Sequence, residues 1–131
     1  LRRVKQLRTM PYPGFPTDAQ SVFLAALTTA RGTSLIVENI FTDRFRPVGE
    51  LLRMGADARV EGRAALVHGV KQLYAAPVEA TDLRGGAALV TAGLMAKGTT
   101  VIHGIHHIDR GYEHLEDTLT ELGASVRRIR Q

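Results

Sequence analysis

Apolar residues recur at helical spacing along two long stretches of the chain. In the first stretch they fall at positions i, i+3, i+4 and i+7, the pattern of a helix with one core-facing side. Thr17 and Gln20 form a capping-box pair that predicts the start of this helix, and Gly32 predicts its end. The side chains expected to face the core are Ala19, Val22, Phe23, Ala26, Leu27 and Ala30.

The second stretch runs from Asp82 to about Lys97 and has almost no polar positions. A helix that is apolar all round is buried on every side, whereas a helix on the outer face of a sheet keeps a solvent-facing stripe. This stretch therefore predicts a helix in the interior of the molecule.

Two shorter helices are also predicted, one from Pro47 to Gly55 and one over residues 111–122, which Gly123 ends. The inward side chains are expected to be Val48, Leu51 and Leu52 in the first, and Tyr112, Leu115, Leu119 and Leu122 in the second.

Short runs of branched apolar residues predict the strands. These runs cover residues 1–9, 35–40, 77–80, 99–105 and 125–129, and residues 58–60 and 65–67 flank a turn at 61–64 that is typical of a hairpin. Three prolines within residues 11–16 exclude a helix or central strand there and predict an irregular loop.

The same order of predicted elements and charged residues occurs twice along the chain. Thr17-Asp18 and Thr81-Asp82 open the two long helices, and Asp43-Arg44 and Asp109-Arg110 follow the next strands, at a spacing of 64 to 66 positions. Such a period indicates a repeated supersecondary unit. Each unit is predicted to run β-α-β-α-β, with helices at the centre, strands outside and a hairpin strand added in the first.

Composition narrows the class of protein. The 131 residues are 44% hydrophobic, enough for one ordinary core, and no apolar run approaches the length of a membrane span. The absence of cysteine excludes a disulfide framework and a thiol nucleophile within these residues and fits a cytosolic protein. The chain begins at Leu1, so we expect it to be cut from a longer polypeptide.

The charge suggests an anionic partner of small size. The formal net charge is +4, with basic residues gathered at both ends, but only 5% of the residues are aromatic. Without an aromatic RNA-binding motif or a recognition-helix pattern, nucleic acid is disfavoured against a solvated surface or a site for small anions.

Two acids and three arginines are the candidates for chemistry. Asp18 and Asp82 stand at helix starts, where an acid ordinarily caps free N–H groups; Thr17 and Thr81 could do that capping instead. Arg84 lies in the first turn of an apolar helix, an unfavourable place for a cation, so it calls for an anionic partner such as Asp82 or a bound carboxylate or phosphate.

Arg44 and Arg110 occupy equivalent loops, each behind an aspartate. Either could form an ordinary surface ion pair. Arginines converging near helix starts could instead bind phosphate or carboxylate in bidentate fashion.

Metal and nucleotide motifs are lacking in the sequence. His103, His106 and His107 have no carboxylate or cysteine at zinc-site spacing, so no metal is expected. No P-loop, Rossmann glycine pattern or Gly-x-Ser-x-Gly elbow is present, and no cofactor is expected.

Five ordered blocks resemble the family of UDP-N-acetylglucosamine 1-carboxyvinyltransferases, the enolpyruvyl transferases of peptidoglycan synthesis. The resemblance runs from about Pro11 to the end of the chain. Its motifs are PGFPTDAQ at residues 13–20, ENIFTDRF at 38–45, LLRMGA at 51–56, ATDLR at 80–84 and HIDRGYE at 107–113.

The resemblance implies an α/β fold of repeated βαβαββ units in an inside-out barrel, with helices buried and sheets outside. The chain would be an incomplete C-terminal domain over residues 1–131, with about two units at 10–80 and 81–131. It would need the missing N-terminal part, which supplies a Lys-Asn pair and a proton donor, and would be inactive alone.

The resemblance also implies the reaction and its residues. The enolpyruvyl group of phosphoenolpyruvate passes to the 3′-hydroxyl of UDP-N-acetylglucosamine, a cytoplasmic step that serves cell wall biogenesis, cell shape, the cell cycle and division. The implied site comprises Asp18 as the base, Ile40 on the UDP-sugar, Arg84 and Arg110 on phosphoenolpyruvate, Arg44 beside them, and Asp82 orienting Arg84 or the sugar.

Two other functions remain open from the sequence. The sister enzyme that acts on shikimate 3-phosphate shares fold and chemistry, although its glycine-phenylalanine-proline loop and Asp109-Arg110 turn should differ. A non-catalytic module that binds anions or nucleic acid through its basic ends is the other.

Overall fold

The long helices form where capping residues and apolar spacing predict them. The computed structural model describes residues 2–3, 6–10, 17–40, 45–112 and 114–129, without the side chains of Thr17 and Asp18. Helix α1 spans Thr17–Leu27, α2 Pro47–Arg53 and α3 Leu83–Met95, followed by the short helices α4 (His106–Asp109) and α5 (Leu115–Glu121). The irregular loop predicted at residues 11–16 lies outside the described residues.

Within the described residues, six strands form two sheets. Strands β1 (Gln6–Arg8), β2 (Thr33–Val37), β3 (Asp57–Glu61) and β4 (Ala64–His68) pair in the order β1-β2-β4-β3. Strands β5 (Pro77–Glu79) and β6 (Val101–His103) form a separate parallel pair. The hairpin of β3 and β4 is confirmed, and it turns through Gly62, whose φ of 56° suits glycine.

The same β-α-β arrangement is built twice. Helix α1 connects the parallel strands β1 and β2, and α3 connects the parallel strands β5 and β6. An isolated parallel bridge precedes the strands of each pair in the sequence: Arg2 pairs with Arg31 before β1 and β2, and Tyr74 pairs with Lys97 before β5 and β6.

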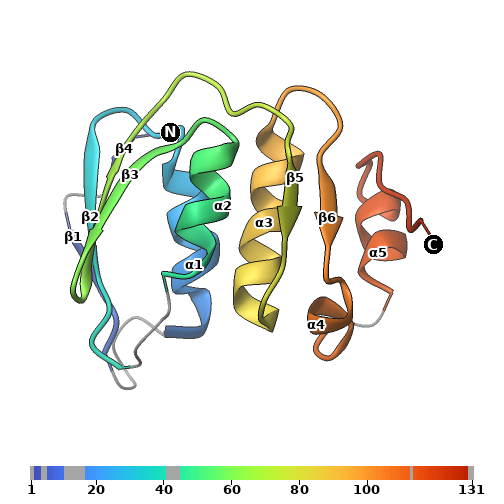
Figure 1. Cartoon of the computed structure of the whole chain (residues 1–131), viewed down its shortest axis with the longest axis horizontal. Helices are drawn as coiled ribbons and strands as arrows, with labels where there is room; N and C mark the ends of the chain where they lie inside the picture. The colour runs from blue at the N-terminus through green and yellow to red at the C-terminus, as the bar shows by residue number, and fades with distance from the viewer. Residues whose placement is uncertain (1, 4–5, 11–16, 41–44, 113, 130–131) are drawn as a thin grey trace.

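The three longer helices lie between the sheets. In Figure 1, α1 and α2 stand beside α3, with the four-stranded sheet on one flank and β5 and β6 on the other. Leu24, Leu51, Leu89, Ile36 and Val67 are fully or almost fully buried in this shared core. The predicted α/β architecture, with central helices and outer strands, is confirmed.

The buried side of α1 is rotated from the predicted one. Leu24, Ala25 and Thr28 are fully buried, whereas Phe23 is 45% exposed. Because α1 packs against α3 as well as the sheet, its small and polar residues enter the interface and the face with the largest side chain does not.

Two predicted core residues are also exposed in α2 and α3. Leu52 lies on the open side of α2, and Met54, just after the helix, is buried in the core. Helix α3 is buried along Gly85, Gly86, Ala88, Leu89 and Ala92, but Leu94 is half exposed, so α3 is not enclosed on every side.

The C-terminal elements differ most from their prediction. The helix expected over residues 111–122 starts only at Leu115, after α4 and a left-handed residue at His114 (φ 51°). Tyr112 is exposed, Leu122 is 79% exposed, and α5 has no buried residue. Residues 125–129, predicted as the last strand, form no strand in the described structure.

Candidate functional site

One end of the molecule gathers the starts of the helices and the ends of the parallel strands. In Figure 1, α1 and α3 begin at the lower end, and β2, β5 and β6 run toward the same end. This follows from the two parallel β-α-β connections. Free N–H groups and the positive ends of helix dipoles therefore meet there, which favours anions.

Asp82 itself caps α3. Its backbone is extended (φ −156°) and its Oδ2 accepts a hydrogen bond from the Gly85 N–H at 3.2 Å. The suggestion that Thr81 takes this role is therefore wrong. Gly85 suits the cap, because a Cβ there would lie 2.5 Å from Asp82 Oδ1.

The second carboxylate oxygen of Asp82 is buried without a hydrogen-bond partner among the described residues. A buried acceptor left unsatisfied is costly, so such atoms in native proteins ordinarily meet a ligand, a water or another part of the protein. Asp82 thus has one oxygen committed to structure and one available for a donor.

A cleft of about 330 Å³ opens beside Asp82, between the starts of α2 and α3 and the end of β5. Its charged lining consists of one guanidinium and three carboxylates: Arg46, Glu50, Glu79 and Asp82. Arg46, at the N-cap of α2, was missed from the sequence, although a cation directly before the helix proline is the same signal that singled out Arg84.

Arg84 and Arg110 come from backbone segments that touch. A Cβ on Gly111 would lie 2.5 Å from Leu83 Cδ2, and one on Gly86 would lie 2.6 Å from Ile108 Cγ1. The first turn of α3 therefore packs directly on the end of α4. Arg84 is half-buried and Arg110 exposed, and neither lines the cleft beside Asp82.

Ile40 is held by a buried carboxylate that the sequence analysis did not select. Glu38 is 2% exposed, and its Oε2 accepts from the Thr9 hydroxyl at 2.6 Å and from the Ile40 N–H at 2.9 Å. Thr9 Oγ1 in turn accepts from the Asn39 N–H at 2.8 Å. Glu38 thereby ties the chain leaving β2 to the end of β1.

Two predicted site residues fall outside what can be described. Asp18 lies in the first turn of α1, but its side chain is not among those described, and Arg44 lies in the undescribed segment 41–44. Their convergence with Arg84 and Arg110 stays a prediction.

Behind the Asp109-Arg110 turn, Arg128 engages two carboxylates at once. Its Nη2 and Nη1 donate to the Asp109 oxygens at 2.8 and 3.0 Å, and its Nε and Nη2 donate to the Glu116 oxygens at 3.0 and 3.1 Å. These hydrogen bonds lower the pKa of Asp109 and of Glu116 below their ordinary values and raise the pKa of Arg128.

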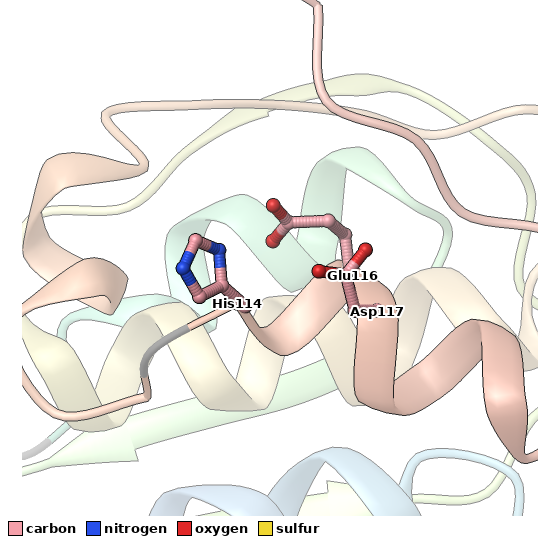
Figure 2. A group of neighbouring side chains, drawn as sticks. All are labelled: His114, Glu116 and Asp117. Atoms are coloured by element: carbon pink, nitrogen blue, oxygen red, sulfur yellow. The ribbon is translucent and has the colours of Figure 1, made fainter.

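The carboxylate of Glu116 also belongs to a group of potential metal ligands. His114, Glu116 and Asp117, drawn in Figure 2, each offer one ligand atom. These atoms lie within 4.8 Å of one another. Because the guanidinium of Arg128 already occupies Glu116, a metal cation would have to displace it. His103, His106 and His107 do not form such a group among the described residues.

No helix in the described part of the chain has the length and apolar character needed to cross a membrane.

Comparison with known proteins agrees with this architecture. A UDP-N-acetylglucosamine 1-carboxyvinyltransferase 3 of Symbiobacterium thermophilum is 62% identical over 125 residues, which cover 95% of this chain and 30% of that protein. A UDP-N-acetylglucosamine 1-carboxyvinyltransferase of Thermodesulfovibrio yellowstonii is 57% identical over 124 residues, with the same coverage. The chain thus spans about three-tenths of the length of these relatives.

Similarity of structure points the same way. The crystal structure of the enolpyruvyl transferase NikO from Streptomyces tendae matches 96% of this chain and 29% of its own, with a TM-score of 0.85 and 30% sequence identity. The model of the EPSP synthase (3-phosphoshikimate 1-carboxyvinyltransferase) family matches residues 2–119. On the strength of that match over most of its length, the chain belongs to the EPSP synthase family.

Proposed function

We propose that this chain is part of an enzyme that transfers the enolpyruvyl group of phosphoenolpyruvate to the 3′-hydroxyl of UDP-N-acetylglucosamine. The names of the relatives that are 57% and 62% identical support this choice of acceptor. The five ordered sequence motifs agree with it.

The reaction needs a base, an acid and a binding site for two anionic groups. The acceptor hydroxyl loses its proton and its oxygen bonds to C-2 of phosphoenolpyruvate, while C-3 takes up a proton. The tetrahedral intermediate then loses a C-3 proton and expels phosphate, which restores the double bond. Proton transfer by a positioned side chain contributes about 10²- to 10⁴-fold to such a step.

Asp18 takes the acceptor proton and Ile40 contacts the UDP-sugar through its backbone. The Ile40 N–H already donates to Glu38, so we assign the sugar contact to the Ile40 carbonyl. Asp82, one of whose oxygens is buried without a partner among the described residues, orients Arg84 or accepts from a sugar hydroxyl.

Arg84 and Arg110 bind the phosphate and carboxylate of phosphoenolpyruvate, and Arg44 supports the same pocket. The packing of Leu83 on Gly111 carries this assignment, because it joins the segments that bear Arg84 and Arg110. Two guanidinium groups from adjacent segments suit a small molecule with two anionic groups.

Residues 10–80 and 81–131 are proposed as two βαβαββ-type units of an inside-out barrel in the C-terminal domain. The proton donor and the Lys-Asn pair would come from the remainder of the enzyme, so these residues alone should not turn over. The activity would place the complete enzyme in the cytoplasm, in cell wall biogenesis, and so in cell shape, the cell cycle and division.

The experiment is an acceptor comparison with the complete enzyme. We expect phosphate release from phosphoenolpyruvate that depends on UDP-N-acetylglucosamine and not on shikimate 3-phosphate. The shikimate acceptor is a real competitor, because the matching family model carries that enzyme's name. Release with shikimate 3-phosphate alone would reverse the assignment. Release with neither, together with salt-dependent nucleic-acid binding, would favour a non-catalytic module.

A further inference from the structure

The guanidinium of Arg128 is the bridge between three segments that share little other packing. It binds Asp109 at the end of α4 and Glu116 in α5, and it belongs to the irregular segment 125–129. Helix α5 has no buried residue, so burial of apolar surface does little to hold it in place. A bidentate guanidinium–carboxylate pair, in contrast, fixes both distance and orientation.

The end of α4 is held from two sides. Ile108 is 5% exposed and packs against Gly86 of α3, which fixes the inner side. Asp109, its neighbour, points its carboxylate into the fork of Arg128 on the outer side. Arg110 follows as the C-cap of α4, and the N–H groups of Gly111 and Tyr112 both donate to the Ile108 carbonyl.

We infer that Arg128 is a positioning residue, which locks the Asp109-Arg110 turn so that Arg110 meets phosphoenolpyruvate in a fixed orientation. This inference rests on the proposed function. Arg128 acts through Asp109 and touches no substrate itself, so its loss should loosen an anion contact and leave the UDP-sugar contact unchanged.

The simpler alternative is an exposed ion pair with a small structural role. Such pairs contribute little to stability and are screened by salt. The two explanations differ in what they affect. A purely structural pair changes thermal stability slightly and affects both substrates equally, whereas a positioning residue raises the KM of one substrate.

The test compares Arg128→Gln with Arg127→Gln in the complete enzyme. Arg127 is the adjacent exposed arginine and provides a matched loss of charge. We expect Arg128→Gln to raise the KM for phosphoenolpyruvate roughly tenfold, because misplacement of a binding group by about 1 Å can cost up to about 100-fold. The KM for UDP-N-acetylglucosamine should stay within about twofold, and Arg127→Gln should resemble wild type.

Arg128→Lys keeps the charge but loses the two-pronged geometry, so it should rescue the effect only in part. Hydrogen exchange supplies a readout apart from activity: the amides of Gly111 and Tyr112 should lose protection in Arg128→Gln and keep it in Arg127→Gln.

Equal phosphoenolpyruvate KM values in the two glutamine variants, or an equal rise for both substrates in Arg128→Gln, would overturn the inference. Full rescue by lysine would show that charge alone matters and would also overturn it. Failure of the wild-type enzyme to transfer enolpyruvyl groups would instead overturn the proposed function, so the two failures are distinguishable.

Discussion

The two carboxylate oxygens of Asp82 lie in different environments. One oxygen caps α3 through the Gly85 N–H, and the other is buried without a partner among the described residues. The proposed functional role would use the second oxygen, so it does not conflict with the cap. Substitutions that keep or remove each oxygen therefore separate capping from chemistry.

Asp82→Asn and Asp82→Ala should behave differently in stability and alike in activity. Asparagine caps helices about as well as aspartate, whereas alanine typically costs about 1 kcal/mol. We expect only Asp82→Ala to lower the denaturation midpoint of the complete enzyme, while both variants lose most of the turnover. Turnover near wild type in Asp82→Asn would reduce Asp82 to a cap.

At the level of elements, the first half of α3 packs where side chains are smallest. A Cβ on Gly86 would lie 2.6 Å from Ile108 Cγ1, whereas one on Gly93, in the same helix, would lie no closer than 3.5 Å to Thr100. The two glycines therefore differ in the space around them and form a matched pair.

Gly86→Ala should destabilise the protein by about 1–3 kcal/mol through overpacking between α3 and α4. Gly93→Ala should be neutral or stabilising by up to about 1 kcal/mol, because alanine favours helix. Chemical denaturation of the complete enzyme measures both. Equal effects of the two substitutions would contradict the close packing of α4 on α3.

The ion pairs of Arg128 should depend on pH. Because the folded pKa values of Asp109 and Glu116 are lowered, their stabilising contribution is complete above the ordinary values of 3.8 and 4.5 and is lost as pH falls through the lower folded values. Limited proteolysis within residues 124–129 should therefore speed up below about pH 4, and sooner in high salt. Rates that do not respond to acid would contradict this clamp.

The sequence predicted α1, α3 and the β3–β4 hairpin because each carries a local signal: capping residues, helical spacing or turn glycine. The break between α4 and α5 had no such signal. Tyr112 and Leu122 have helical spacing, yet both are exposed. The hydrogen bond from Arg128 to Glu116 and the left-handed backbone of His114 hold these segments in place, and the spacing of apolar residues reveals neither of them.

The candidate site was predictable in part for the same reason. Asp82, Arg84 and Arg110 stood out by charge in apolar or post-strand positions. Glu38 did not, because its importance lies in contacts made across the fold, such as the hydrogen bond from Thr9 to Glu38. Arg46 was missed although it stands at a helix start, as Arg84 does.

On the scale of the whole molecule, two β-α-β arrangements share one core of helices and leave apolar side chains at the surface. Phe23, Leu52 and Leu94 are each about half exposed, although helix positions of this kind ordinarily pack against another element. Relatives of this chain are more than three times as long, which leaves ample sequence to cover them.

The isolated 131-residue chain should therefore bind a dye that reports exposed apolar surface. The complete enzyme, in which further units would cover these residues, should bind much less per molecule. Fluorescence titration of both proteins measures this. A cooperative melt of the isolated chain without dye binding would contradict the requirement for further units.

The proposed role of Asp18 as the base of an enolpyruvyl transfer is tested by the turnover of Asp18→Asn in the complete enzyme. We expect kcat to fall by about 10²- to 10⁴-fold, with the Kd for UDP-N-acetylglucosamine within about twofold of wild type. A kcat close to that of the wild-type enzyme would contradict it.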